Sequence, residues 1–194
     1  GIVLVRLPGG ELWMGTREDE RQAVLDGAVR SLGEPLDGAT RRRLRHVLLT
    51  EAPCHRVVLS PFLMAKYEVS QDQWHRVLGG EWPEDEDEDR PAYGRSWYAC
   101  RKFCRKAGLR LPTEAQWEFA CRAGTRTAFA FGDEITKAQV DFDARPVSDL
   151  PPEGTVPVDA LPLNGFGLHN VHGNVAEWCL DVFVKDFGER PESR

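Results

Sequence analysis

The chain has 194 residues, of which 41% are hydrophobic and 29% charged, a balance typical of a soluble globular protein. Its length fits one domain, or one domain with an insertion. The net charge of −6 gives no overall case for nucleic-acid binding, and no apolar run approaches the roughly 20 residues of a membrane-spanning helix. No signal peptide is visible and the five cysteines do not indicate a disulfide framework. These observations slightly favour a cytoplasmic location and leave the compartment open.

Short strands are predicted at two places in the N-terminal half of the chain. Residues 2–14 alternate loosely between apolar and polar side chains around the turn Pro8–Gly10. This pattern predicts two strands joined in a hairpin. The stretches Val57–Leu59 and Phe62–Val69 also have the composition of strands.

The segment Thr16–Thr50 differs from its surroundings because it is charged and rich in Ala, Leu and Arg. Four of its apolar residues follow the spacing of one helix face: Leu25, Ala28, Val29 and Leu32. This spacing predicts a helix from about Glu18 to Leu32. A second helix is predicted from Ala39 to Leu49.

Three more helices are predicted from their start signals. The patterns Ser70-x-x-Gln73 and Thr113-x-x-Gln116 are capping boxes, which place a helix start directly after the Ser or Thr. Between them, a helix is predicted from near Ser96 to Gly108. Gly and Pro residues interrupt the segment from Gly124 to Pro157, which is therefore predicted to be mostly irregular. Loops of this length are usually functional or held by ligands.

Two charged clusters have a functional and a plain interpretation. Arg41–Arg43, with Arg45 and His46, could bind phosphate or an acidic partner. A solvated helix face is the favoured interpretation. The acidic block Glu84–Asp89 could collect cations loosely, but a surface loop is favoured because the block repels itself and contains no turn glycine.

Residues 163–178, LNGFGLHNVHGNVAEW, combine glycines, amide and carboxylate oxygens, and apolar anchors. A loop of this kind, pinned to a core, can hold its oxygens toward a hard cation such as calcium. One ring of side-chain and carbonyl oxygens could come from Asn170, Gly173, Val175 and Glu177. The alternative is a Gly/Asn turn that binds nothing, and composition alone favours this alternative.

Thiol and imidazole side chains offer further candidate ligands. Cys100 and Cys104 lie four residues apart on a predicted helix and could share a soft metal such as copper(I) or zinc. Packing in the core is the favoured interpretation, because free cysteine is commonly buried. His169 and His172 could be metal ligands or bases, although a structural role is favoured for both.

Four blocks of the sequence, in order, resemble the formylglycine-generating enzyme family, also called the sulfatase-modifying factor family. They are GELWMGT at Gly10–Thr16, E-x-P-x-H-x-V followed by FLMAKYEVSQDQW within Glu51–Trp74, RLPTEAQWEFACRAGT at Arg110–Thr125, and PVDALPLNGFGLHNVHGNVAEW at Pro157–Trp178. The resemblance implies an α+β fold of the C-type lectin type, with low regular secondary structure and loops fixed by calcium. Residues 17–50 are longer than the family usually needs, so we expect a helical insertion within a single domain over residues 1–194.

The resemblance also implies which residues hold calcium. The calcium loop of the family corresponds to Asn170, Gly173, Val175 and Glu177, with Ala176 in place of the usual Trp. A second family site would begin at Asp141 and Phe142. Its later ligands would fall near Asp149–Pro152, where the spacing departs from the family pattern.

The C-terminal end departs further from the family. Members continue into two more strands, and the active enzymes carry two copper-binding cysteines in that region. The visible chain ends at Arg194, and Cys179 does not stand at the matching position. We therefore expect the domain to be C-terminally incomplete, and copper is expected only if the missing region carries the cysteine pair.

Two functions remain open, and the visible residues assign no catalytic group. The favoured one is a calcium-stabilised module that binds a protein or peptide ligand and lacks the copper-cysteine site in the visible chain. The alternative is part of a copper-dependent oxidase that converts a cysteine of a client protein to formylglycine, completed by C-terminal sequence or by a second chain. Neither a nucleic acid nor a membrane is expected as partner.

Overall fold

The computed structural model describes residues 1–22, 26, 37–80, 87–136, 138–141 and 154–182. The chain divides into two compact units. The first contains residues 1–10 and 59–181, and the second contains residues 11–58 and 182–194. Helices and short antiparallel strands are mixed along the chain, which confirms the α+β prediction. Within the described ranges, every helix is too short or too polar to cross a bilayer.

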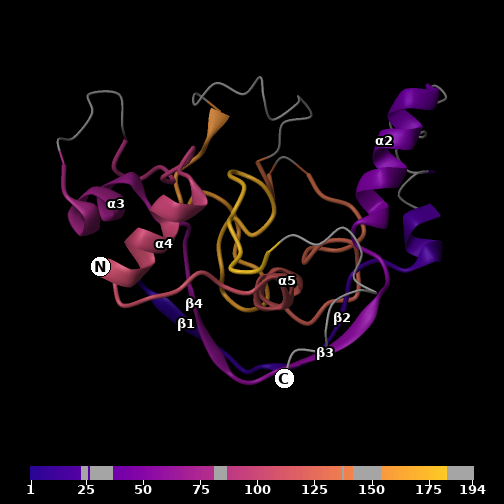
Figure 1. The fold of residues 1–194 in the computed structure, drawn as a ribbon, viewed down its shortest axis with the longest axis horizontal. Helices are drawn as coiled ribbons and strands as arrows, with labels where there is room; N and C mark the ends of the chain where they lie inside the picture. Colours follow the sequence, from indigo (N-terminus) through magenta and orange to yellow (C-terminus); the bar gives the residue numbers. More distant parts are fainter. Residues whose placement is uncertain (23–25, 27–36, 81–86, 137, 142–153, 183–194) are drawn as a thin grey trace. The chain divides into compact units, whose positions relative to one another are not determined.

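The strands form two separate pairs (Figure 1). They are β1 (Leu4–Leu7), β2 (Gly10–Met14), β3 (His55–Leu59) and β4 (Phe62–Ala65). β1 pairs antiparallel with β4, in the register Leu4 to Ala65 and Leu7 to Phe62, and β2 pairs with β3. The predicted hairpin between β1 and β2 is therefore wrong, although both strands form.

The reason lies in the glycine between β1 and β2. Gly9 has a φ of +68°, and a Cβ atom on it would lie 2.4 Å from the backbone oxygen of Leu59. The chain thus passes tightly against the segment between β3 and β4 and does not fold back on itself. Alternation of side chains predicts a strand but does not name its partner.

The strand predicted over Phe62–Val69 ends early, at Ala65. The backbone beyond it bonds to loops. The oxygen of Lys66 accepts a hydrogen bond from His169 N (3.0 Å), and the oxygen of Val69 accepts one from Ala92 N (2.8 Å). These loop contacts take the place of a ladder with a neighbouring strand.

Three helices of the first unit confirm the predicted start signals: α3 (Gln71–Leu78), α4 (Trp97–Lys106) and α5 (Glu114–Arg122). At α3, Ser70 Oγ accepts from Gln73 N and the Gln73 side chain accepts from Ser70 N, both at 3.2 Å. Thr113 and Gln116 make the same reciprocal pair at α5. Each cap satisfies backbone donors that the first helical turn leaves open.

Aromatic packing joins α3 to α4. The Phe103 ring of α4 stacks on the Trp74 ring of α3, with 5.2 Å between centroids and 1° between planes. Phe103 is 1% exposed, and Leu7, Val140 and Leu168 are buried to the same extent. Two of these four residues, Val140 and Leu168, lie outside helices and strands. The irregular segments therefore contribute to the core and do not merely cover it.

The second unit contains the predicted helical segment. Residues 18–22 and 26 are helical, while the rest of the helix predicted to Leu32 lies outside the described residues. The predicted second helix is confirmed as α2 (Gly38–Leu49), which Asp37 caps by accepting from Ala39 N and Thr40 N. Thr16 N donates to the oxygen of Glu51 (3.1 Å), so the two ends of the segment are neighbours. That residues 17–50 form an insertion stays a prediction.

Both charged clusters lie at the surface where they are described. Arg41, Arg42, Arg45 and His46 on α2 are exposed. Asp87, which belongs to the acidic block, is exposed and pairs with Arg90 at 3.1 Å. The start of that block, residues 84–86, lies outside the described residues. The plain interpretations therefore fit the exposed residues of both clusters.

Candidate functional site

The candidate site is the loop of residues 164–178, which Asn164 anchors to the end of α5. Asn164 is buried, and its Nδ2 donates to the backbone oxygen of Ala120 (2.7 Å). Its Oδ1 accepts from the backbone N of Phe166 (3.0 Å) and of Leu168 (3.1 Å). One side chain thus closes the turn and ties it to the helix. The loop is pinned to the core, as its mixture of glycines and apolar residues predicts.

The middle of the loop adopts backbone conformations that few residue types tolerate. Asn170 and Asn174 have φ values of 53° and 59°, in the left-handed region where Asn is enriched. Gly173 has a φ of 102°, and a Cβ atom there would lie 2.0 Å from the backbone oxygen of Asp141. Asn174 N donates to that same oxygen (2.7 Å). Asp141, predicted for the second calcium site, therefore lies against the loop predicted to hold the first, while Phe142 and residues 149–152 lie outside the described residues.

A buried carboxylate lies beneath the loop. Glu68 is 7% exposed, and its Oε2 accepts from Asn170 Nδ2 (3.0 Å) and from Asn174 Nδ2 (2.7 Å). The pKa of Glu68 is raised to about 8: burial is the largest cause, the charge of Glu177 also raises it, and hydrogen bonds from the two amides and from Val175 N lower it. Sequence reasoning did not single out Glu68. The available signal was an acidic residue three positions after the end of β4, inside the block FLMAKYEVSQDQW.

Two buried oxygens, one of this carboxylate and one of Asn170, have unused capacity to accept. Asn170 Oδ1 and Glu68 Oε1 have no hydrogen-bond partner among the described residues. A buried acceptor left without a partner costs about 1–3 kcal/mol. Asn170 Oδ1 is also the predicted calcium ligand, and an amide oxygen is a donor atom that calcium accepts. The donor set therefore fits a hard cation at this point.

The structure gathers the four predicted ligands of the first site around one pocket. The pocket has a volume of about 680 Å³, and its walls include Asn170, Gly173, Val175 and Glu177. Within the described part of the chain, no three His, Cys, Asp or Glu side chains form a metal-binding group. A cation here would consequently depend on amide and backbone oxygens together with one carboxylate.

Glu177 supplies the carboxylate among the four predicted ligands, and Trp117 of α5 holds this side chain in place. Its Oε2 accepts a hydrogen bond from Trp117 Nε1. Glu177 is exposed as a whole residue. Desolvation of its carboxyl group raises the pKa of Glu177, and the hydrogen bond from Trp117 lowers it. The indole N–H thus fixes one carboxylate oxygen and leaves the other available.

The two histidines of the loop have structural contacts. His169 stacks on Tyr67, with 4.9 Å between centroids, and its Nδ1 donates to the backbone oxygen of Leu161 (2.7 Å). His172 Nε2 accepts from the backbone N of Ala130 (2.9 Å), and burial lowers the pKa of this imidazole. Both rings are used in positioning loops, which agrees with the favoured structural interpretation.

The thiols considered as soft-metal ligands are poorly suited to that role. Cys100 and Cys104 are half-buried on α4 and line a larger cavity of about 1660 Å³. Burial raises the pKa of both thiols. Burial, together with the nearby negative charge of Glu114, also raises the pKa of Cys179 to about 12. Because the thiolate is the metal ligand, a raised pKa disfavours binding.

Comparison with known proteins identifies relatives over most of the chain. A formylglycine-generating enzyme from Bos taurus is 37% identical over 92% of this chain and 57% of its own length. One from Thermomonospora curvata is 29% identical over 98% of this chain and 76% of its own length. The serine/threonine-protein kinase pkn1 of Chlamydia caviae is 32% identical over 72% of this chain and 26% of the kinase.

The chain therefore spans about half the length of the Bos taurus enzyme and about a quarter of the kinase. The family described as "Sulfatase-modifying factor enzyme 1-like domain" matches residues 3–191, nearly the whole chain. All four sequence blocks that resemble this family lie within the matched residues. On this evidence the chain belongs to the sulfatase-modifying factor family.

Proposed function

We propose that this chain is a calcium-stabilised binding module of the sulfatase-modifying factor type, which recognises a protein or peptide. One observation carries the calcium part of the proposal. The buried Asn170 Oδ1 has no partner among the described residues, and it lines the same pocket as Gly173, Val175 and Glu177. A cation at this point would satisfy the buried oxygen.

The ion would be held by side-chain oxygens of Asn170 and Glu177 and by backbone carbonyls of Gly173 and Val175. One carboxylate among neutral oxygens is a low ligand charge, so waters complete the shell and the affinity is modest. When bound, calcium supplies a fixed positive charge that stiffens the loop. The protein itself pre-arranges the loop through Asn164 and through the bond from Trp117 to Glu177.

The proposed ligand class follows from the surface that such a loop supports. Loops on a rigid scaffold are suited to recognition. The cavity of about 1660 Å³ has aromatic walls that include Tyr67, Tyr93 and Trp178, which suits the apolar side chains of a peptide. The similarity of this chain to part of a protein named as a kinase also supports a module that serves proteins of different named activities.

Calcium is expected to raise the melting temperature of the protein. An ion that binds only the native state adds roughly 2.7 kcal/mol when free calcium is a hundredfold above its dissociation constant. The measurement is a pair of melting curves, one with calcium and one with a chelator. If the midpoint does not move, residues 170–177 form an ordinary Asn/Gly turn.

The variant Glu177→Gln serves as the matched control for that measurement. It keeps the shape of the side chain and its ability to accept from Trp117, but it removes the only carboxylate of the proposed ligand set. We expect a higher calcium dissociation constant and a smaller shift of the midpoint. An unchanged shift in this variant would place the ion elsewhere.

A second candidate function is formylglycine generation, which the names of the Bos taurus and Thermomonospora curvata relatives favour. In this alternative, copper is held by a cysteine pair in C-terminal sequence or in a second chain, and the residues described above only support the fold. Mass spectrometry of a cysteine peptide incubated with the protein, copper and oxygen tests this alternative. Formylglycine in the product would support it and overturn the assignment as a binding module alone.

A further inference from the structure

We propose that Glu68 is a positioning residue for the calcium loop: its buried carboxylate holds two asparagine amides so that the oxygen of one faces the cation. This inference rests on the proposed calcium function and goes beyond it, because Glu68 is outside the proposed ligand set. Glu68 lies just beyond β4, whereas Asn170 of the loop follows it by 102 residues in the chain.

The hydrogen bonds determine which way the Asn170 amide faces. An amide nitrogen carries two donors. For Asn170, Nδ2 donates to Glu68 Oε2 (3.0 Å) and to the backbone oxygen of Pro157 (3.3 Å). Both donors are used on one side of the side chain, so Oδ1 is directed to the other side. Rotating the amide would place Oδ1 against two acceptors and lose both bonds.

Glu68 fixes a second point of the loop with the same atom. Its Oε2 also accepts from Asn174 Nδ2 (2.7 Å), whose other partner is the backbone oxygen of Val156 (3.1 Å). The two asparagines flank Gly173, whose carbonyl is a proposed ligand. One carboxylate oxygen thus determines where both sides of the ligand segment lie.

The chemistry of Glu68 favours a role beyond packing. Burying a carboxylate is costly unless charge or hydrogen bonds compensate it. At 7% exposure Glu68 has amide donors, yet its Oε1 is without a partner in the part of the chain that the structure describes. A positive charge bound at Asn170 Oδ1 would offset part of the cost of burying this carboxyl group through the electrostatic field, without contacting it. Outer residues that orient metal ligands typically change metal affinity 10- to 100-fold when they are altered.

The test uses terbium as an oxygen-seeking substitute for calcium, with emission excited through Trp117, whose indole donates to Glu177. Emission lifetimes in H2O and D2O count the waters on the ion, and calcium competition gives its affinity. Two variants separate the length of the side chain from its ability to ionise. Glu68→Asp keeps the carboxyl group but withdraws it from the amides, and Glu68→Gln keeps an acceptor oxygen in place but removes the ionisable group.

We expect Glu68→Asp to bind calcium at least about tenfold more weakly, with one additional water replacing Asn170 Oδ1. Glu68→Gln is expected to keep the wild-type water number and to lose less than about tenfold in affinity. Phe103→Leu controls for general destabilisation, because it should lower the melting temperature and leave the water number unchanged.

The proposal is overturned if Glu68→Asp keeps the wild-type water number and affinity, or if Glu68→Gln is the more damaging variant. In either case Glu68 acts through packing or charge, while the calcium site itself stands. If the wild-type protein binds neither terbium nor calcium, the proposed calcium function fails and this inference fails with it. The wild-type measurement therefore distinguishes the two failures.

Discussion

Replacing Phe103 with Ala is expected to lower the free energy of unfolding by about 3–5 kcal/mol, the usual cost of removing a buried Phe side chain. Phe103 is 1% exposed and stacks on Trp74, with 5.2 Å between ring centroids. The substitution removes the ring that joins α4 to α3 and leaves a cavity. Urea denaturation followed by circular dichroism measures the change.

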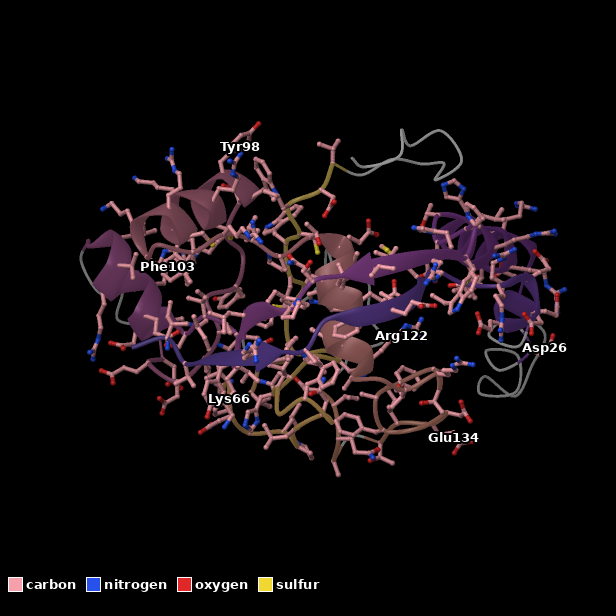
Figure 2. All side chains as sticks on the ribbon, turned by 90° about the horizontal axis from the view of Figure 1, so that it is seen from below. Asp26, Lys66, Tyr98, Phe103, Arg122 and Glu134 are labelled. Atoms are coloured by element: carbon pink, nitrogen blue, oxygen red, sulfur yellow. The ribbon has the colours of Figure 1, made fainter. Side chains whose placement is uncertain are left out.

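Tyr98 provides the matched control on the same helix (Figure 2). It is also aromatic but 80% exposed, so Tyr98→Ala is expected to change the unfolding free energy by no more than about 0.5 kcal/mol. Equal losses for the two variants would contradict the assignment of Phe103 to the core.

Replacing Gly173 with Ala is expected to cost about 3 kcal/mol, at the upper end of the range for backbone strain. Gly173 has a φ of 102°, which disfavours any side chain, and the new Cβ would lie 2.0 Å from the backbone oxygen of Asp141. Because the obstructing atom belongs to the backbone, it cannot move aside cheaply. The contact also lies beside the bond from Asn174 N to the same oxygen (2.7 Å), which the variant should break.

Gly167 separates the two causes of that loss. Its φ of +78° is also positive, but a Cβ atom there meets nothing within 4 Å among the described residues. Gly167→Ala should therefore carry only the conformational cost, about 1 kcal/mol. Urea denaturation of both variants in a chelator keeps metal binding out of the comparison. A loss in Gly173→Ala no larger than in Gly167→Ala would show that the contact with Asp141 is not tight.

Local signals predicted the helices well. The boxes at Ser70 and Thr113 fix helix starts because the Ser or Thr and its Gln partner lie within one turn, so no distant residue takes part. Strand partners were not predictable in the same way. β1 and β2 have the composition of strands, but their pairing depends on how closely Gly9 approaches the segment after β3.

At the candidate site too, local features were predictable and contacts between distant residues were not. Composition indicated a pinned loop, and family resemblance indicated which oxygens would face a cation. Glu68 was missed because its importance comes from contacts with Asn170 and Asn174, which are remote in sequence. No periodicity or spacing connects these positions. Only the fold brings the carboxylate beneath the loop.

The anchoring of Asn164 has a consequence for the chemical ageing of the protein. Asn164 precedes Gly165, and an Asn-Gly pair in a flexible chain deamidates when the glycine nitrogen attacks the side-chain carbonyl carbon. Here Oδ1 is held by Phe166 N and Leu168 N, and Nδ2 by the backbone oxygens of Ala120 and Cys121. The attack requires this side chain to leave all four partners and rotate. The hydrogen bonds that close the turn therefore also protect Asn164 from deamidation. The extent of deamidation at Asn164 is consequently a measure of how often the loop opens.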